Sequence, residues 1–96
     1  MRGNGTVLVV DDEAQIVRSL RASLAAAGYA VAVAGTVRGA LEAAALHPPD
    51  AVVLDLRLPD GDGVEVCRRL REWSQAPIVV VSAIDDEAEK LSLIHI

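Results

Sequence analysis

Four short, mostly apolar runs separated by longer amphipathic segments most constrain the fold of this chain. The runs are Thr6–Val10, Tyr29–Ala34, Ala51–Leu56 and Ile78–Val81. Thr6–Val10 is too short for a helix and rich in valine, a pattern that favours a strand buried on both faces, whereas the alanines of Tyr29–Ala34 give that run a lower strand propensity. Strands that alternate with helices form a parallel sheet with right-handed crossovers. The sequence therefore predicts an α/β fold, and 96 residues suffice for one such domain.

The segments between these runs have the residue spacing of amphipathic helices. Helices are expected over Glu13–Ala27, Thr36–Leu46 and Gly63–Ser74, with a fourth beginning over Asp85–Lys90. Gly28 stands where glycine commonly ends a helix, and Thr36 is a suitable N-cap. The residues predicted to face the sheet are Val17, Leu20, Leu24, Ala27, Val37, Ala40, Leu41, Ala44, Val66, Leu70 and Trp73.

Carboxylates stand where two of the predicted strands end. Asp55 is the last polar residue of the third run, and Asp11 and Asp12 follow the first run. Open parallel sheets bind their ligands at the carboxyl ends of the strands. Oxygen ligands alone suit hard divalent cations such as Mg²⁺. A Mg²⁺ site lined by acids from two strands is therefore expected at this edge of the sheet.

Three short motifs occur in order, each at the end of a predicted strand. They are Val9-Val10-Asp11-Asp12-Glu13, then Leu54-Asp55-Leu56-Arg57-Leu58-Pro59 with Asp62-Gly63, and finally Val81-Ser82-Ala83. Together they resemble the motifs of receiver domains in two-component response regulators. The stretch Glu65–Ser74 is further similar to regulators that carry a winged-helix DNA-binding domain, notably the potassium-responsive type. The resemblance implies a flavodoxin-like, doubly wound parallel sheet of strand order 2-1-3-4, with the fifth strand and last helix missing.

This resemblance implies a role for each matching residue. Asp55 would accept a phosphoryl group from a histidine kinase, and the Ser82 hydroxyl would bond to that group and act as a switch. Mg²⁺ would be bound by Asp11, Asp12, Asp55 and the backbone carbonyl of Arg57. The domain would serve as a phosphoacceptor in a phosphorelay, with autodephosphorylation at most, and not as a turnover enzyme.

The receiver pattern spans residues 6–90, after a polar lead-in of residues 1–5. The lysine that receivers place after strand five is missing, and Ile78–Val81 is expected to be an unpaired edge strand. The remaining residues, Leu91–Ile96, can be encoded by CTG TCT CTT ATA CAC ATC, which resembles a transposase end sequence used in sequencing libraries. They are expected to be a non-native tail, with a divergent fourth helix as the alternative.

Charge and composition restrict the expected partners and location. The formal net charge is −5 and the pI about 4.8, which argues against direct nucleic-acid binding by this segment. DNA binding is instead expected to be the function of a C-terminal output domain in the full-length protein. The single cysteine, Cys67, suits a reducing compartment. No run approaches the roughly 18 apolar residues of a membrane span, so a cytoplasmic domain without membrane contact is expected.

Other interpretations of the same residues stay open at this point. Asp12 has the spacing of an N-cap in a capping box, and Asp60 and Asp62 are typical turn residues. A phosphatase of the haloacid-dehalogenase type also uses a strand-end aspartate with Mg²⁺. Phosphatases of that class have a second acid two residues after the nucleophile, and this chain has Arg57 at that position. A truncated or pseudo-receiver that acts only as an interaction module is the remaining alternative.

Overall fold

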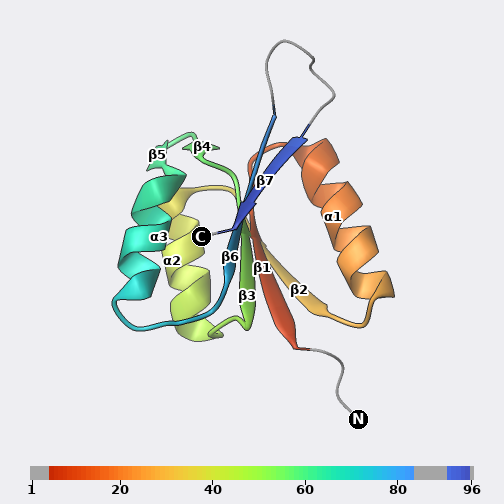
Figure 1. The fold of residues 1–96 in the computed structure, drawn as a ribbon, viewed down its shortest axis with the longest axis horizontal. Helices are drawn as coiled ribbons and strands as arrows, with labels where there is room; N and C mark the ends of the chain where they lie inside the picture. The colour runs from red at the N-terminus through yellow and green to blue at the C-terminus, as the bar shows by residue number, and fades with distance from the viewer. Residues whose placement is uncertain (1–4, 84–90, 96) are drawn as a thin grey trace.

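A five-stranded sheet forms the centre of the molecule (Figure 1). The computed structural model describes residues 5–83 and 91–95. The strands of this sheet are β1 Thr6–Val10, β2 Ala30–Ala34, β3 Ala51–Leu54, β6 Ile78–Ala83 and β7 Leu91–His95. The first four are parallel and lie in the order β2-β1-β3-β6, while β7 pairs with β6 in the antiparallel sense. The predicted α/β class and strand order 2-1-3-4 are confirmed.

Helices cover both faces of this sheet (Figure 1). Helix α1, Ala14–Ala26, lies on one face, and helices α2, Val37–Leu46, and α3, Gly63–Arg71, lie together on the other. A small antiparallel hairpin, β4 Arg57–Leu58 with β5 Gly61–Asp62, connects β3 to α3. None of the helices in the described part of the chain has the length and apolar character to cross a membrane.

The main core lies between the sheet and the pair formed by α2 and α3. Side chains alternate along a strand, so Leu8 and Val10 of β1 share this face with Val52 and Leu54 of β3, and all are buried. The helices contribute buried residues at helical spacing, as predicted: Ala40, Ala44, Val66 and Leu70. Full burial of a valine or leucine side chain contributes about 1.5–3 kcal/mol. Cys67 is buried in the same core, as a structural residue.

The face under α1 is less well covered. Strand residues Val7 and Val9 are buried there, but no residue of α1 itself is buried. The predicted inner positions Val17, Leu20 and Leu24 are half-buried. Ala27, predicted to be an inner residue as well, is exposed because it is the C-cap beyond the last turn.

Two predicted helix ends are confirmed by their hydrogen bonds. The Thr36 side chain accepts a bond from the Gly39 N–H at 2.9 Å and caps α2. Gly28 follows α1 with φ of +97°, a conformation that glycine adopts without steric cost. Its N–H donates to the Ala25 carbonyl at 3.0 Å, which satisfies one of the last free carbonyls of the helix.

Several predicted boundaries were wrong. The third strand ends at Leu54 and not at Leu56, because the chain then turns into the β4–β5 hairpin. The third helix ends at Arg71, so Trp73 lies beyond it and is 50% exposed instead of packed inward. The start of a fourth helix over 85–90 lies outside the described residues.

The predicted unpaired edge at the fourth strand was also wrong. Residues Ile78–Val81 belong to a longer strand, and β7 covers its free side with a register that pairs Val81 with Leu93. The backbone of 91–95 is extended, so the alternative of a helix there is wrong too. An exposed strand edge offers a row of unpaired N–H and C=O groups, and a following extended segment can satisfy them.

Candidate functional site

The predicted acids meet at the carboxyl ends of two neighbouring strands. Val10 of β1 pairs with Leu54 of β3, so the residues that follow each strand are also neighbours. The Asp55 N–H donates to the Val10 carbonyl at 2.8 Å, which continues the parallel ladder past the end of β3. Carboxylate oxygens of Asp11, Asp12 and Asp55 all lie within 4.8 Å of one another. The predicted convergence of these three residues is observed.

Asp11 is the most constrained member of the group. It is only 5% exposed, and its N–H donates to the Ala34 carbonyl of β2 at 3.0 Å. Its Oδ1 accepts the Glu13 N–H at 2.9 Å. Burial raises the pKa of Asp11 above its usual value, and the charges of Asp55 and Asp12 raise it further, against the lowering effect of the Glu13 bond. Negative charge is therefore concentrated where a cation would stabilise it.

Asp12 is exposed and does not serve as the cap of α1. The N-cap position is Glu13, which makes no side-chain capping bond, and the helix begins at Ala14. The capping interpretation of Asp12 was therefore wrong. Its carboxylate belongs instead to the acidic cluster with Asp11 and Asp55.

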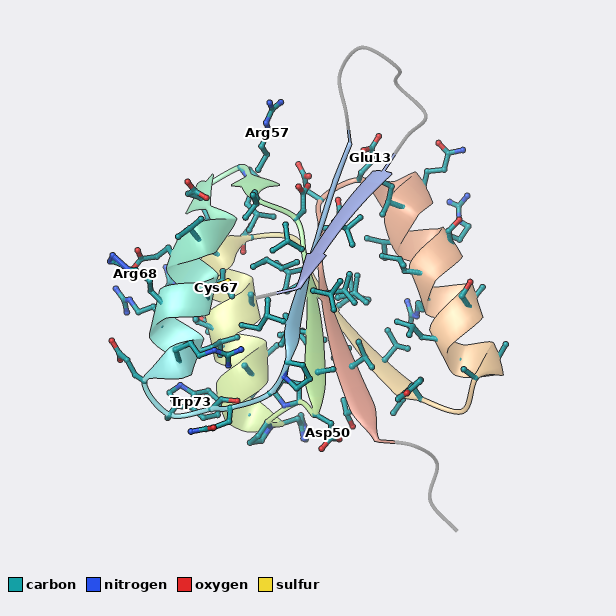
Figure 2. All side chains as sticks on the ribbon, viewed as in Figure 1. Glu13, Asp50, Arg57, Cys67, Arg68 and Trp73 are labelled. Atoms are coloured by element: carbon teal, nitrogen blue, oxygen red, sulfur yellow. The ribbon has the colours of Figure 1, made fainter. Side chains whose placement is uncertain are left out.

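Asp55 is half-buried at the start of a tightly folded loop. Its Oδ1 accepts the Arg57 N–H at 3.2 Å. Gly63 lies directly against this loop: its N–H donates to the Leu56 carbonyl at 2.8 Å, and a Cβ at position 63 would overlap the Asp55 carbonyl oxygen. Only glycine fits there without a backbone shift. The Arg57 side chain points away from the sheet into solvent (Figure 2).

Ser82 lies near the carboxyl end of β6, at the same end of the parallel strands as the acidic cluster. Leu54 pairs with Val80, which places Ser82 two positions farther along β6 and Asp55 one position past β3. The structure describes Ser82 through its backbone, and its side chain lies outside the described part. A role for its hydroxyl therefore stays a prediction.

The sequence did not predict the hydrogen bonds that two other aspartates of this loop make to backbone N–H groups. Asp62, predicted to be a turn residue, caps α3 by accepting the Val64 N–H at 2.9 Å. Asp60 accepts the N–H groups of Val37 and Arg38 at 2.7 and 3.1 Å. An acid just before a helix is a signal for the first contact. No local signal exists for the second, because its partners lie 23 and 22 residues away.

The chemistry of this donor set suits a hard cation. Three carboxylates supply only oxygen atoms, and they come from two strand ends that the sheet holds in register. Mg²⁺ prefers such oxygen ligands and is commonly held by one or two carboxylates together with phosphate oxygens. The residues present therefore fit a magnesium site that is open to a phosphate ligand.

Comparison with known proteins gives one consistent family. The model of the response regulator receiver domain matches residues 7–96. The transcriptional regulatory protein KdpE of Mycobacterium tuberculosis H37Rv is 54% identical over 85 residues, which cover 88% of this chain and 38% of that protein. The KDP operon transcriptional regulatory protein KdpE of Escherichia coli K12 is 46% identical over 86 residues, covering 90% of this chain and 38% of that protein.

Solved structures agree with the sequence relatives. The crystal structure of the BeF3-activated N-terminal receiver domain of RstA from Klebsiella pneumoniae matches with a TM-score of 0.77 at 32% identity. The match covers 88% of this chain and 72% of that one. By contrast, the chain spans about 38% of the length of the curated KdpE relatives.

Proposed function

The chain belongs to the response regulator receiver family of two-component signalling, and we propose that Asp55 is its phosphoacceptor. The observation that carries this proposal is the meeting of Asp11, Asp12 and Asp55 at one edge of the parallel sheet. Of the three, Asp55 is half-buried at the end of the central strand β3. Its Oδ1 is oriented by the Arg57 N–H, and its second oxygen is the natural nucleophile.

The reaction is the transfer of a phosphoryl group from a phosphohistidine of a kinase. An Asp55 oxygen forms a new bond to phosphorus while the bond from phosphorus to the imidazole nitrogen breaks, and that nitrogen keeps the electron pair. Asp11 and Asp12 hold negative charge beside the acceptor. Mg²⁺, bound by Asp11, Asp12, Asp55 and the carbonyl of Arg57, would supply the positive charge that offsets repulsion between carboxylate and phosphoryl oxygens.

A second hydrogen-bonding group follows from the register of β6. We assign to the Ser82 hydroxyl the role of donor to a phosphoryl oxygen, since its position lies at the same strand edge as Asp55. Movement of that hydroxyl toward the phosphoryl group would displace the carboxyl end of β6. Coupling of a local bond to a larger two-state rearrangement is the usual form of such a switch.

The relatives suggest the setting in which this receiver works. Both KdpE proteins are transcriptional regulators by name, so a C-terminal DNA-binding output domain, a cognate histidine kinase and a cytoplasmic location are proposed for the full-length protein. The net charge of −5 supports a division of labour in which this segment signals and another segment binds DNA. A haloacid-dehalogenase type of phosphatase is disfavoured, because Arg57 occupies the position of its second acid and points into solvent.

Chemical phosphorylation tests the proposal. The chain is incubated with acetyl phosphate labelled on phosphorus, with and without Mg²⁺. We expect Mg²⁺-dependent incorporation of an acid-stable, base-labile label, and none in Asp55→Asn. Equal labelling of the Asp55→Asn variant would contradict the assignment.

A further inference from the structure

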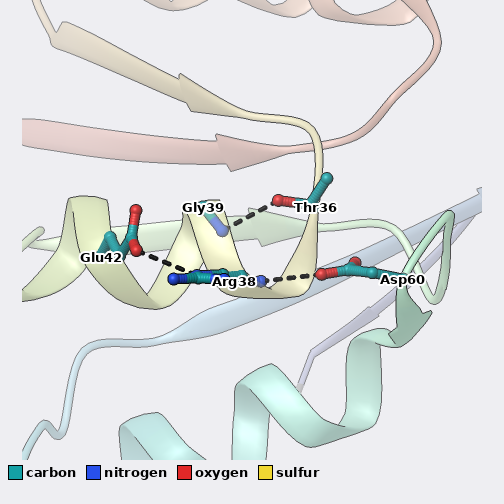
Figure 3. Close-up of polar contacts among 5 residues, drawn as sticks. All are labelled: Thr36, Arg38, Gly39, Glu42 and Asp60. Atoms are coloured by element: carbon teal, nitrogen blue, oxygen red, sulfur yellow. Dashed lines mark hydrogen bonds and ion pairs between the residues drawn. The ribbon is translucent and has the colours of Figure 1, made fainter.

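The carboxylate of Asp60 joins the hairpin after β3 to the start of α2, two elements far apart in sequence. Figure 3 shows Asp60 approaching the first turn of the helix from the β4–β5 side. Its Oδ1 accepts the Val37 N–H at 2.7 Å, and its Oδ2 accepts the Arg38 N–H at 3.1 Å. The first N–H groups of a helix have no partner within the helix, and the helix dipole favours an anion there.

Helix α2 already has a cap of its own. The Thr36 hydroxyl accepts the Gly39 N–H at 2.9 Å, which is the ordinary bond of an N-cap residue. Asp60 takes the two preceding N–H groups, those of Val37 and Arg38. The start of α2 therefore has two side-chain acceptors: Thr36 from its own segment and Asp60 from the β4–β5 hairpin. Asp60 not only caps the helix but also links it to the hairpin.

On one side, this contact is anchored to the loop that carries Asp55. The hairpin pairs Arg57 with Asp62 and Leu58 with Gly61, and the Leu58 side chain is buried in the core. Asp60 sits at the turn of this hairpin, five residues after Asp55. Because only Leu56–Pro59 separate the turn from Asp55, and Arg57 and Leu58 are paired in the hairpin, a displacement of the turn would also displace Asp55.

On the other side, the contact lies just after β2, whose last residue accepts a hydrogen bond from the Asp11 backbone. Val37 is three residues after Ala34, whose carbonyl accepts the Asp11 N–H at 3.0 Å. Gly35, between them, lies close to the Asp11 and Asp12 backbone: a Cβ built there would be 3.8 Å from the Asp11 carbonyl oxygen. The start of α2 is thus tied to the acidic pair after β1.

We propose that Asp60 is a positioning residue. It ties the hairpin that follows Asp55 to the start of α2, beside Ala34 and Gly35, which lie against the backbone of Asp11 and Asp12, and so reinforces the separation of Asp55 from that pair. This inference rests on the proposed function of Asp55. Two hydrogen bonds to one carboxylate define both the distance and the orientation of the turn. Misplacement of a reacting group by about 1 Å can cost up to 100-fold in rate, so a tether outside the site matters for transfer.

The state of the carboxylate supports this role at neutral pH. The N–H groups of Val37 and Arg38 hold the pKa of Asp60 below its usual value. Asp60 is thus ionised when the transfer reaction runs, and both of its oxygens are acceptors. Arg38 contributes its backbone N–H to this contact, while its side chain pairs with Glu42 at 3.2 Å on the exposed side of the helix (Figure 3).

The test compares two ways of weakening the same helix start. Asp60→Ala removes the tether between the loops, whereas Thr36→Ala removes only the local cap of α2. Each variant of the 96-residue chain is labelled with acetyl phosphate over a series of Mg²⁺ concentrations. Hydrogen exchange of the Val37 and Arg38 amides reports whether the contact is lost, and circular dichroism reports whether the chain is folded.

We expect Asp60→Ala to lower the initial labelling rate roughly tenfold and to raise the Mg²⁺ concentration needed for half-maximal rate. Thr36→Ala should leave both values near those of the original chain. Asp60→Asn, whose amide oxygen can still accept one N–H, should fall between them and keeps the test valid if the alanine variant fails to fold.

Two results would overturn the inference while leaving the phosphoacceptor intact. One is labelling of Asp60→Ala and Asp60→Asn at the original rate although the Val37 and Arg38 amides exchange faster. The other is an equal loss of rate in Thr36→Ala, which would make Asp60 no more than a helix cap. If the original chain takes no label at all, the proposed function fails and the positioning role falls with it.

Discussion

At the scale of single residues, the three clustered aspartates differ in burial and in hydrogen bonding. Asp11 is buried and bonded to the Glu13 N–H, Asp55 is half-buried at the strand end, and Asp12 is exposed. Their mutual repulsion contributes to the raised pKa of Asp11. An exposed carboxylate that no helix uses as a cap is free to bind a cation, and Asp12 is in that position.

The first prediction concerns this carboxylate. Asp12→Ala should weaken Mg²⁺ binding roughly tenfold or more, because one of the three carboxylate donors and its charge are removed. Isothermal titration calorimetry measures the affinity. Glu42→Ala is the matched control, since Glu42 is an exposed acid on α2 that pairs with Arg38, away from the acidic cluster. Equal Mg²⁺ affinities in the two variants would contradict the site.

The second prediction concerns the glycine under the Asp55 loop. Gly63→Ala should destabilise the fold by about 1–3 kcal/mol through overpacking and should slow labelling, because the new Cβ overlaps the Asp55 carbonyl oxygen. Urea unfolding measures the loss. Gly35→Ala is the control, since its Cβ would meet the Asp11 and Asp12 backbone at 3.8 and 3.9 Å, which is ordinary contact. A loss as large in Gly35→Ala would refute the explanation.

The residues of the site were predictable to different degrees. Asp11, Asp12 and Asp55 were found because each follows an apolar run, and parallel strands bring their ends together. Asp60 was assigned only to a turn, because its partners Val37 and Arg38 are brought near by the tertiary fold and not by local sequence.

At the scale of elements, apolar pattern decided most of the fold. The run Thr6–Val10 and the cap at Thr36 were placed correctly from valine content and side-chain chemistry. The β4–β5 hairpin was not predicted, since its strands have two residues each and lack an alternating pattern. Trp73 was predicted to face inward because its spacing from Val66 and Leu70 continues the helical period, but the helix stops at Arg71.

The third prediction tests the packing of α3 on the sheet. Leu70 is 1% exposed, so Leu70→Ala should destabilise the fold by about 2–5 kcal/mol. Val64 is on the same helix but 46% exposed, and Val64→Ala should change stability by about 0.5 kcal/mol or less. Urea unfolding of both variants, followed by circular dichroism, gives the comparison. Similar losses in the two would mean that α3 packs differently.

At the scale of the whole molecule, the two faces of the sheet are buried to different extents by the helices that cover them. Helices α2 and α3 bury one face almost completely, while α1 leaves its own inner residues only half-buried. Strand β7 completes the edge beside β6 among the described residues. The origin of Leu91–Ile96 in a sequencing adapter stays a prediction, because the extended backbone of residues 91–95 is compatible with either origin. Sequencing the locus with a different library chemistry decides it.

The central claim is that one particular carboxylate of this chain accepts the phosphoryl group. The most direct measurement is chemical trapping: the chain is phosphorylated with acetyl phosphate and Mg²⁺, and borohydride then reduces the acyl phosphate to homoserine. Tandem mass spectrometry locates the homoserine in the peptide that spans the β3–α3 loop. We predict homoserine at position 55 and unchanged aspartate at positions 11, 12 and 60. Homoserine at any of those three positions, with Asp55 intact, would contradict the account.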